Sequence, residues 1–345
     1  MPHRLASGLI AAMLSSAAAA LDQRDIAALI SLRPSVLKVE ASDVRGNVGI
    51  GTGVAVAPGV IATACHFTAH ATSVRVVVNS ERMQARHQRA QMARDLCLLD
   101  VPGASDVKPV PLREGPLQTG EELVALGYIL GAAPRVSNGI VLRLHDFDGG
   151  KVIQSTTPFT SGASGGGLFD REGRLVGLMA FRFRSGTDNQ FSVPVSWIRE
   201  GLADTPEGDI APLKGQPFWS RAGDELPAFL RLQQLEAESR WADLETLARQ
   251  RIAQSPDDAA AWHALGVARA ASGAPETALD AFVHADMLDQ GNPVFLTDLA
   301  LAQLRARDEA AYRTTRARLL RVSPAAAASL DARSHRCDVE QEHQC

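Results

Sequence analysis

Ser164 lies in the most glycine-rich stretch of the chain, TSGASGGGLF, residues 160–169. Glycine costs backbone entropy in folded elements, so such a cluster indicates a backbone that turns sharply or approaches another group closely. A serine hydroxyl becomes a nucleophile when a base lies within hydrogen-bond reach and a third group orients that base. The N–H groups of Gly162 and Ser164 could then stabilise the oxyanion of an acyl transition state. The stretch predicts acyl transfer, and a glycine-rich surface loop is the alternative.

One family with this serine environment can be set aside. The residues around Ser164, GASGG, match the G-x-S-x-G elbow of α/β-hydrolases. That fold requires the chain order Ser, Asp, His and a helix directly after the serine. No helical pattern follows Ser164, and every later histidine lies in the helical second half or the tail of the chain. These histidines are His263, His284, His335 and His343.

The order His, Asp, Ser belongs instead to chymotrypsin-like double barrels. Residues 63–66, TACH, resemble the T-A-A-H signature of trypsin-like proteases and place His66 at the end of an apolar strand. Residues 93–101, ARDLCLLDV, resemble the family's D-[LI]-A-[LV]-L segment, in which the aspartate is Asp95. With Ser164, the three motifs resemble the trypsin-like serine proteases.

Further segments are similar to the HtrA-like bacterial branch, so that the resemblance covers about residues 34–199. These segments are residues 51–54, 154–156, 173–177 and 190–194. The chain departs from the family pattern G-N-S-G-G-P, since Ala163 replaces the asparagine and Gly167 the proline. It also lacks a visible PDZ domain, and helical repeats follow the β-rich region instead.

The resemblance implies a role for each residue. Ser164 attacks a peptide carbonyl, His66 takes its proton and passes it to the leaving amine, and Asp95 holds the correct imidazole tautomer. His70 is the rival base, although its place beyond His66 favours a surface position. Asp100 is the rival acid, although a strand end before a proline favours a role in a turn.

The same resemblance indicates where a substrate would bind. The substrate would lie along residues 180–183 and pair with them as an added strand, in contact with Ala180, Phe181 and Arg182. Phe159, together with Pro158, would line the floor of the specificity pocket. Because this part of the sequence contains no acidic residue, we expect a small or apolar side chain to be preferred there over arginine or lysine.

Residues 1–20 have the features of a secretory signal peptide: basic residues at the start, an apolar run over residues 5–14, and small residues at a possible cleavage site. An N-terminal cytosolic helix is the alternative. We expect export, to the bacterial periplasm or the medium. In an oxidising compartment Cys65 and Cys97 could pair or remain buried thiols, and Cys337 could pair with Cys345.

The chain of 345 residues is long enough for two domains. Residues 33–194 contain short β-type runs, about ten residues apart and broken by glycine and proline, which indicate an all-β barrel or sandwich. Residues 81–94 are the one stretch here that could form a helix. The predicted fold is therefore multidomain: an all-β, chymotrypsin-like double barrel, the protease domain of residues 21–203, and then an all-α tetratricopeptide-repeat domain.

Residues 204–224 are rich in proline and glycine and are predicted to be a linker. From residue 225 onward the pattern becomes helical, and residues 259–292 fit a tetratricopeptide repeat with degenerate copies on either side, at 225–258 and 293–326. A plain helical bundle is the alternative, and residues 327–345 form a tail. The residues that match the repeat are Trp262, Leu265, Gly266, Ala278, Phe282 and Ala285.

The expected ligands are proteins or peptides. A net charge of −4 offers no basic surface for nucleic acid, and cysteine and histidine are too sparse for a zinc site, so no metal or organic cofactor is implied. The inner face of the repeats would either recruit a substrate or partner or pack on the protease domain. The leading hypothesis is a secreted serine endopeptidase. The alternatives are an inactive protease-like scaffold for binding proteins and an esterase using the same residues. The inner-face residues are Leu226, Phe229, Ala260, His263, Val267, Val294, Thr297 and Leu301.

Overall fold

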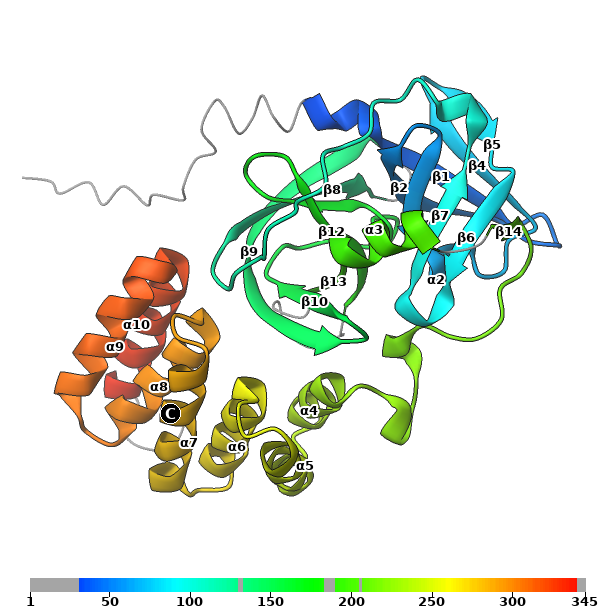
Figure 1. Cartoon of the computed structure of the whole chain (residues 1–345). Helices are drawn as coiled ribbons and strands as arrows, with labels where there is room; N and C mark the ends of the chain where they lie inside the picture. Colours follow the sequence, from blue (N-terminus) through cyan, green and yellow to red (C-terminus); the bar gives the residue numbers. More distant parts are fainter. Residues whose placement is uncertain (1–30, 130–132, 183–189, 205–206, 340–345) are drawn as a thin grey trace, which may run out of the picture.

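The chain folds into a β-rich part with two packed sheets and a helical part that follows it, as the computed structural model in Figure 1 shows. The structure describes residues 31–129, 133–182, 190–204 and 207–339. The predicted fold class is confirmed: a chymotrypsin-like β-rich domain precedes an all-helical region. The predicted signal peptide, residues 1–20, lies outside the described residues.

The first sheet is antiparallel, with the strand order β14-β6-β7-β3-β2-β1-β4-β5. Its core holds branched side chains that alternate along the strands, among them Val39, Ile61 and Val76. Its strands are β1 (Val36–Ser42), β2 (Val48–Ala57), β3 (Val60–Ala64), β4 (Ser73–Val78), β5 (Glu81–Gln84), β6 (His87–Gln91), β7 (Leu96–Asp100) and β14 (Gly208–Asp209).

The helix that seemed possible at residues 81–94 is wrong. This stretch contains β5, β6 and a single 3₁₀ turn, η2 (Met92–Arg94). The two strands are stabilised by pairing with β4 and β7, which are separate segments of the chain. Tertiary pairing therefore overrides the local helical preference here.

The second sheet closes into a barrel with the order β10-β13-β12-β11-β8-β9. Its interior is filled by side chains such as Leu123, Ile153 and Leu168. Helix α3 (Val195–Asp204) follows the last barrel strand and buries Trp197 and Ile198 in the core. The strands are β8 (Glu122–Tyr128), β9 (Pro134–Phe147), β10 (Gly150–Ser155), β11 (Gly167–Phe169), β12 (Leu175–Arg182) and β13 (Gln190–Pro194).

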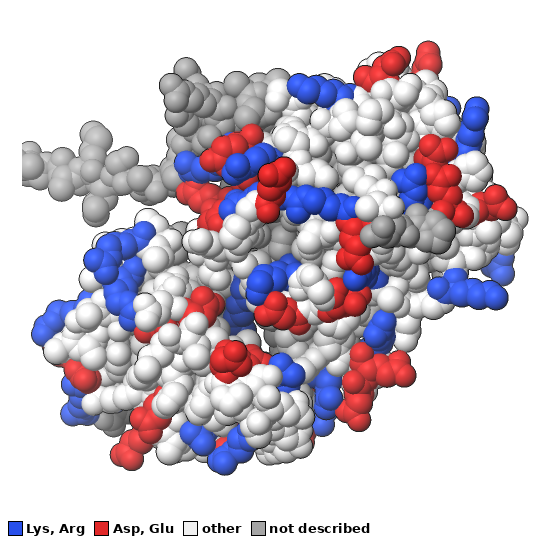
Figure 2. Space-filling view, viewed as in Figure 1, with Lys and Arg blue, Asp and Glu red and all other residues white. Residues whose placement is uncertain are grey.

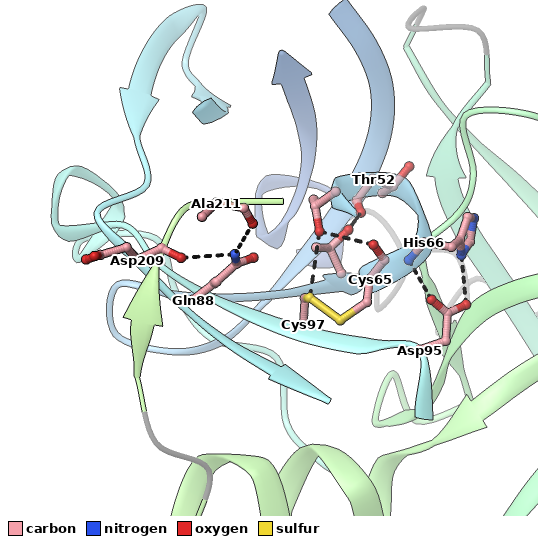
Figure 3. The surroundings of a disulfide bond; sticks show 10 residues. Thr52, Cys65, His66, Gln88, Asp95, Cys97, Asp209 and Ala211 are labelled. Atoms are coloured by element: carbon pink, nitrogen blue, oxygen red, sulfur yellow. Dashed lines mark hydrogen bonds and ion pairs between the residues drawn. A yellow bond between two sulfur atoms is a disulfide. The ribbon is translucent and has the colours of Figure 1, made fainter. Parts of the chain in front are cut away.

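The described residues of the predicted linker, 207–224, lie against the β-rich part. Gln88 Nε2 donates hydrogen bonds to the carbonyl oxygens of Asp209 and Ala211, both at 3.2 Å (Figure 3). Leu213 N donates to Ala69 O at 2.8 Å. Phe218, in the 3₁₀ turn η4 (Phe218–Ser220), is fully buried in the core. This segment therefore packs on both sheets of the β-rich part before the helices begin.

The helical part consists of successive antiparallel helix pairs, consistent with helical repeats. Side chains of Asp258, Asn292 and Asp308 cap three of these helices by accepting backbone N–H bonds. Gly266 lies so close to Phe282 that an added Cβ would be 2.6 Å from its ring. The helices are α4 (Ala228–Ala237), α5 (Trp241–Gln254), α6 (Ala259–Ala271), α7 (Pro275–Leu288), α8 (Pro293–Arg305), α9 (Glu309–Val322) and α10 (Pro324–Val339).

The first helices of these pairs face strands β9 and β10 of the second barrel (Figure 1). The Phe229 ring in α4 stacks on His145 at a centroid distance of 4.3 Å. His263 in α6 is 2% exposed and bonds Arg143 through Nδ1 at 3.0 Å. Phe229 and His263 were both expected on the inner face, and in the structure both contact the barrel. Within the described residues, no helix is long and apolar enough to cross a membrane.

Candidate active site

The structure brings His66, Asp95 and Ser164 together. His66 lies in the short helix α2 (Cys65–Thr68), Asp95 directly before β7, and Ser164 in the loop between β10 and β11. His66 Nδ1 is 2.7 Å from Asp95 Oδ2, and His66 Nε2 is 3.2 Å from Ser164 Oγ. An ionised Asp95 accepts the proton of Nδ1, so Nε2 is the acceptor for the Ser164 hydroxyl. The imidazole therefore bridges an alcohol and a carboxylate.

Strand pairing and a disulfide explain why His66 meets Asp95. Strands β3 and β7 are antiparallel neighbours, with Ala64 opposite Leu96, so the residues just beyond each strand end are adjacent. Cys65 and Cys97 form a disulfide across this junction (Figure 3). His66 N also donates to Asp95 Oδ1 at 2.7 Å. Asp95 itself adopts a left-handed backbone conformation (φ 59°). The disulfide resolves the alternative that the sequence left open for Cys65 and Cys97.

The loop that carries Ser164 is held against the first sheet through Thr52. Thr52 N donates to Ser164 O at 3.0 Å, and Thr52 Oγ1 donates to Gly162 O at 2.7 Å. Gly165 has φ +81°, and a Cβ there would lie 2.3 Å from both Thr52 O and Thr63 Oγ1. The glycine after the serine is therefore required by both its conformation and the close approach of two chain segments.

In the described loop around Ser164, two backbone N–H groups have no acceptor within the protein, whereas their neighbours do. Ala163 N donates to Thr160 O, and Gly165 N donates to Met179 O. Within the described part of the chain, neither Gly162 N nor Ser164 N donates to a protein acceptor. Gly162 has φ +93°, a conformation that glycine adopts readily. The N–H of a nucleophilic residue and that of the residue two positions before it can serve together as donors to an oxyanion.

Asp95 is fully buried, and its carboxylate receives three hydrogen bonds. Two come from His66, and the third comes from the indole of Trp219, whose Nε1 is 2.9 Å from Asp95 Oδ2. A buried carboxylate is costly unless it is paired and hydrogen-bonded. Sequence reasoning missed Trp219 because it lies in a segment whose composition indicated a linker. The adjacent aromatic residues Phe218 and Trp219 in that polar segment were the available signal.

The rival residues lie elsewhere. His70 is exposed beyond α2, and Asp100 at the end of β7 lies 3.6 Å from His87 Nδ1. The structure therefore does not join either of them to the cluster around Ser164. Within the described ranges, no group of three His, Cys, Asp or Glu side chains is arranged to hold a metal ion.

The residues expected to bind substrate lie on or beside β12. Ala180 and Phe181 are buried in that strand, and Phe181 stacks on Trp219 at 5.1 Å. Arg182 is exposed at the end of the strand, and residue 183 lies outside the described residues. Phe159 is buried in the core of the second barrel. On the face shown in Figure 2, acidic and basic side chains are interspersed, and neither sign forms a continuous field.

Comparison with known proteins finds a family model that matches part of the chain. Residues 51–178 match the family model of a trypsin-like peptidase domain. The chain is 27% identical over 184 residues to the peroxisomal leader peptide-processing protease of Mus musculus, covering 48% of this chain and 32% of that protein. It is 28% identical over 177 residues to the anti-sigma-I factor RsgI9 of Acetivibrio thermocellus, covering 50% of this chain and 25% of that protein. The chain thus spans about a third or less of these relatives.

Solved structures of proteases resemble the β-rich part. The active form of the Rv3671c protease from M. tuberculosis superposes with a TM-score of 0.49 at 22% identity, covering 55% of this chain and 88% of that chain. The HtrA-type protease AlgW with a tripeptide gives a TM-score of 0.46 at 23% identity, covering 51% of this chain and 61% of that one.

Proposed function

We propose that this protein is a serine endopeptidase, because residues 51–178 match the family model of a trypsin-like peptidase domain. Ser164 is the nucleophile, His66 the general base and acid, and Asp95 the group that orients His66. The observation that carries the proposal is the hydrogen-bonded series from Ser164 Oγ through the His66 ring to a fully buried Asp95, at 3.2 and 2.7 Å.

In the first half-reaction, Ser164 Oγ attacks the carbonyl carbon of a peptide bond and its proton moves to His66 Nε2. The oxyanion that forms accepts hydrogen bonds from Gly162 N and Ser164 N. The C–N bond then breaks, the leaving amine takes the proton from His66, and Ser164 is left as an ester. Water next attacks this ester with His66 as the base, which releases the acid and restores the serine.

We further propose that the substrate binds along the edge of β12 as an added strand, at Ala180, Phe181 and Arg182. Phe159 contributes to the buried wall behind the loop of Ser164. These side chains include no carboxylate, which favours a small or apolar residue before the scissile bond.

The protein is also proposed to be exported. Residues 1–20 have the composition of a secretory signal. The Cys65–Cys97 disulfide supports an oxidising compartment such as the periplasm, because cytosolic thiols are normally kept reduced.

The helical repeats are proposed to bind part of a substrate or partner as well as the barrel. Val294 and Thr297, two of the expected inner-face residues, line a cleft of about 700 Å³ between α8, α10 and strands β8 and β9. This cleft is large enough for a few side chains of an extended peptide.

A fluorophosphonate probe tests the assignment of the nucleophile. We expect wild type to be labelled, Ser164→Ala to be unlabelled, and Ser161→Ala to be labelled like wild type. Ser161 is the matched control because it is an exposed serine in the same loop. An unlabelled wild type would support the inactive scaffold instead. Casein and a short-chain ester, tested in parallel, separate a peptidase from an esterase.

A further inference from the structure

Trp219 comes after the strands of both sheets in the sequence, yet its indole contacts Asp95 in the candidate active site. It belongs to η4, in the segment between α3 and α4. Its indole Nε1 donates to Asp95 Oδ2 at 2.9 Å, and its ring lies edge-on to the His66 imidazole at a centroid distance of 5.3 Å. We propose that Trp219 is a positioning residue of the hydrolytic site, acting through Asp95 and His66. This inference rests on the proposed function.

The hydrogen bonds at Asp95 indicate what Trp219 does. Oδ1 accepts from the backbone N of His66, and Oδ2 is shared by His66 Nδ1 and Trp219 Nε1. Donors from two directions hold the carboxylate in one orientation. Its Oδ2 then accepts the Nδ1 proton of His66 in one fixed position. The imidazole is thereby kept with Nε2 directed at Ser164 Oγ. Hydrogen bonds to a charged group are among the stronger ones in proteins.

The segment that carries Trp219 is firmly anchored. Phe218 is fully buried, with its ring 4.9 Å from that of Phe147 and 5.6 Å from that of Phe181. Trp219 itself stacks on Phe181 at 5.1 Å, and Phe181 stacks on Phe191 at 4.7 Å. Aromatic pairs at these distances add stability beyond the area they bury. The indole N–H is therefore presented to Asp95 by a rigid support, as a positioning group requires.

The same segment connects the site to the helical part. It continues through η5 (Gly223–Glu225) to α4, and Leu226 just before α4 and Leu230 within it are buried in the same core as Phe218. A residue outside the peptidase family match thus completes the surroundings of Asp95. The β-rich part up to α3 does not contain this donor.

The test is steady-state hydrolysis of a peptide substrate by the full chain, expressed per active site titrated with a fluorophosphonate. Trp219→Phe removes the N–H and keeps an aromatic ring. We expect kcat to fall about 10- to 100-fold with KM unchanged, as for the loss of one hydrogen bond to a charged group. Asp95→Asn serves as the reference for complete loss of the orienting group, and we expect it to lower kcat about 10⁴-fold.

Trp262→Phe is the matched control, because Trp262 Nε1 also donates a single hydrogen bond, to Pro256 O at 2.9 Å in the helical part. It should retain the wild-type kcat. A second variant carries benzothienylalanine at position 219, which keeps the bicyclic ring and replaces N–H by sulfur. An equal fall in kcat would support the role of the N–H, and a wild-type kcat would overturn the inference.

A measurement without turnover separates this inference from the proposed function. The proton between His66 Nδ1 and Asp95 Oδ2 gives a low-field resonance in the ¹H NMR spectrum. Removing the second donor to Oδ2 should move this resonance downfield in Trp219→Phe and leave it unmoved in Trp262→Phe. If Trp219→Phe also leaves it unmoved, the inference is wrong, whether or not the protein hydrolyses peptides.

Discussion

We expect His145 to make the stability of the protein depend on pH where the helical part meets the barrel. The residue lies in β9, where its ring stacks on Phe229 of α4 and its Nε2 donates to Gln154 Oε1 at 2.9 Å. It is 6% exposed. Burial lowers the pKa of His145 from its ordinary 6.5 to about 4, because the charged form would lose its hydration. The folded state therefore favours the neutral imidazole at this interface.

The sign and size of the effect follow from proton linkage. Between pH 6.5 and pH 4, the unfolded chain binds a proton at His145 and the folded chain does not, so the free energy of unfolding falls as the pH falls. The loss is about 2 kcal/mol at pH 5 and about 3 kcal/mol at pH 4. Above pH 6.5 this contribution is fully present.

The variant His145→Gln stays neutral at every pH and keeps an N–H donor for Gln154. We expect wild type to lose about 2 kcal/mol more stability than His145→Gln between pH 7 and pH 5, a shift of about 4–8 °C in melting temperature. The measurement is thermal unfolding followed by tryptophan fluorescence. His70→Gln is the control, since His70 is exposed, and it should behave like wild type. An equal loss in wild type and His145→Gln would refute the reasoning.

Two further predictions concern the surroundings of Ser164 and Asp95. Gly165→Ala should lower turnover by about 10²-fold or more, because the added Cβ would displace the serine loop from Thr52 and small displacements at a reacting group are costly. The control is Gly46→Ala, which should leave turnover unchanged. Gly46 has a similar left-handed backbone conformation but open space around it. Replacing Cys65 and Cys97 together by alanine should lower the free energy of unfolding in urea by about 3–4 kcal/mol, as expected for a bridge closing a loop of 32 residues. If a reductant leaves the wild-type urea midpoint unchanged, the second prediction fails.

The fold class could be predicted because its signals are local and repeated along the chain. Short apolar runs between glycine and proline indicated the β-rich part, and the switch to helical spacing after residue 224 indicated the repeats. The error at residues 81–94 has a physical reason. Strand β5 lies at one edge of the first sheet and β6 lies near the opposite edge, and they pair with β4 and β7, respectively. The helical preference of residues 81–94 does not reveal that β4 and β7 are available for pairing.

Some residues of the candidate site could be predicted from the sequence. His66, Asp95 and Ser164 were identified by motifs, and the structure places their side chains within hydrogen-bond distance. Trp219 could not be found in this way, because it contacts Asp95 across a sequence separation of 124 residues. The proline- and glycine-rich composition of its segment predicts a linker, and it does not indicate where one indole side chain lies.

The sequence by itself determined the order of histidine, aspartate and serine, the glycines that the serine loop needs, and the period of the helices, because each depends on neighbouring residues in the chain. The tertiary structure decided that Cys65 pairs with Cys97, that Trp219 completes the surroundings of Asp95, and that the first repeat helices face the barrel. These are contacts between elements far apart in the chain, and they form only where packing of the buried surfaces brings the elements together.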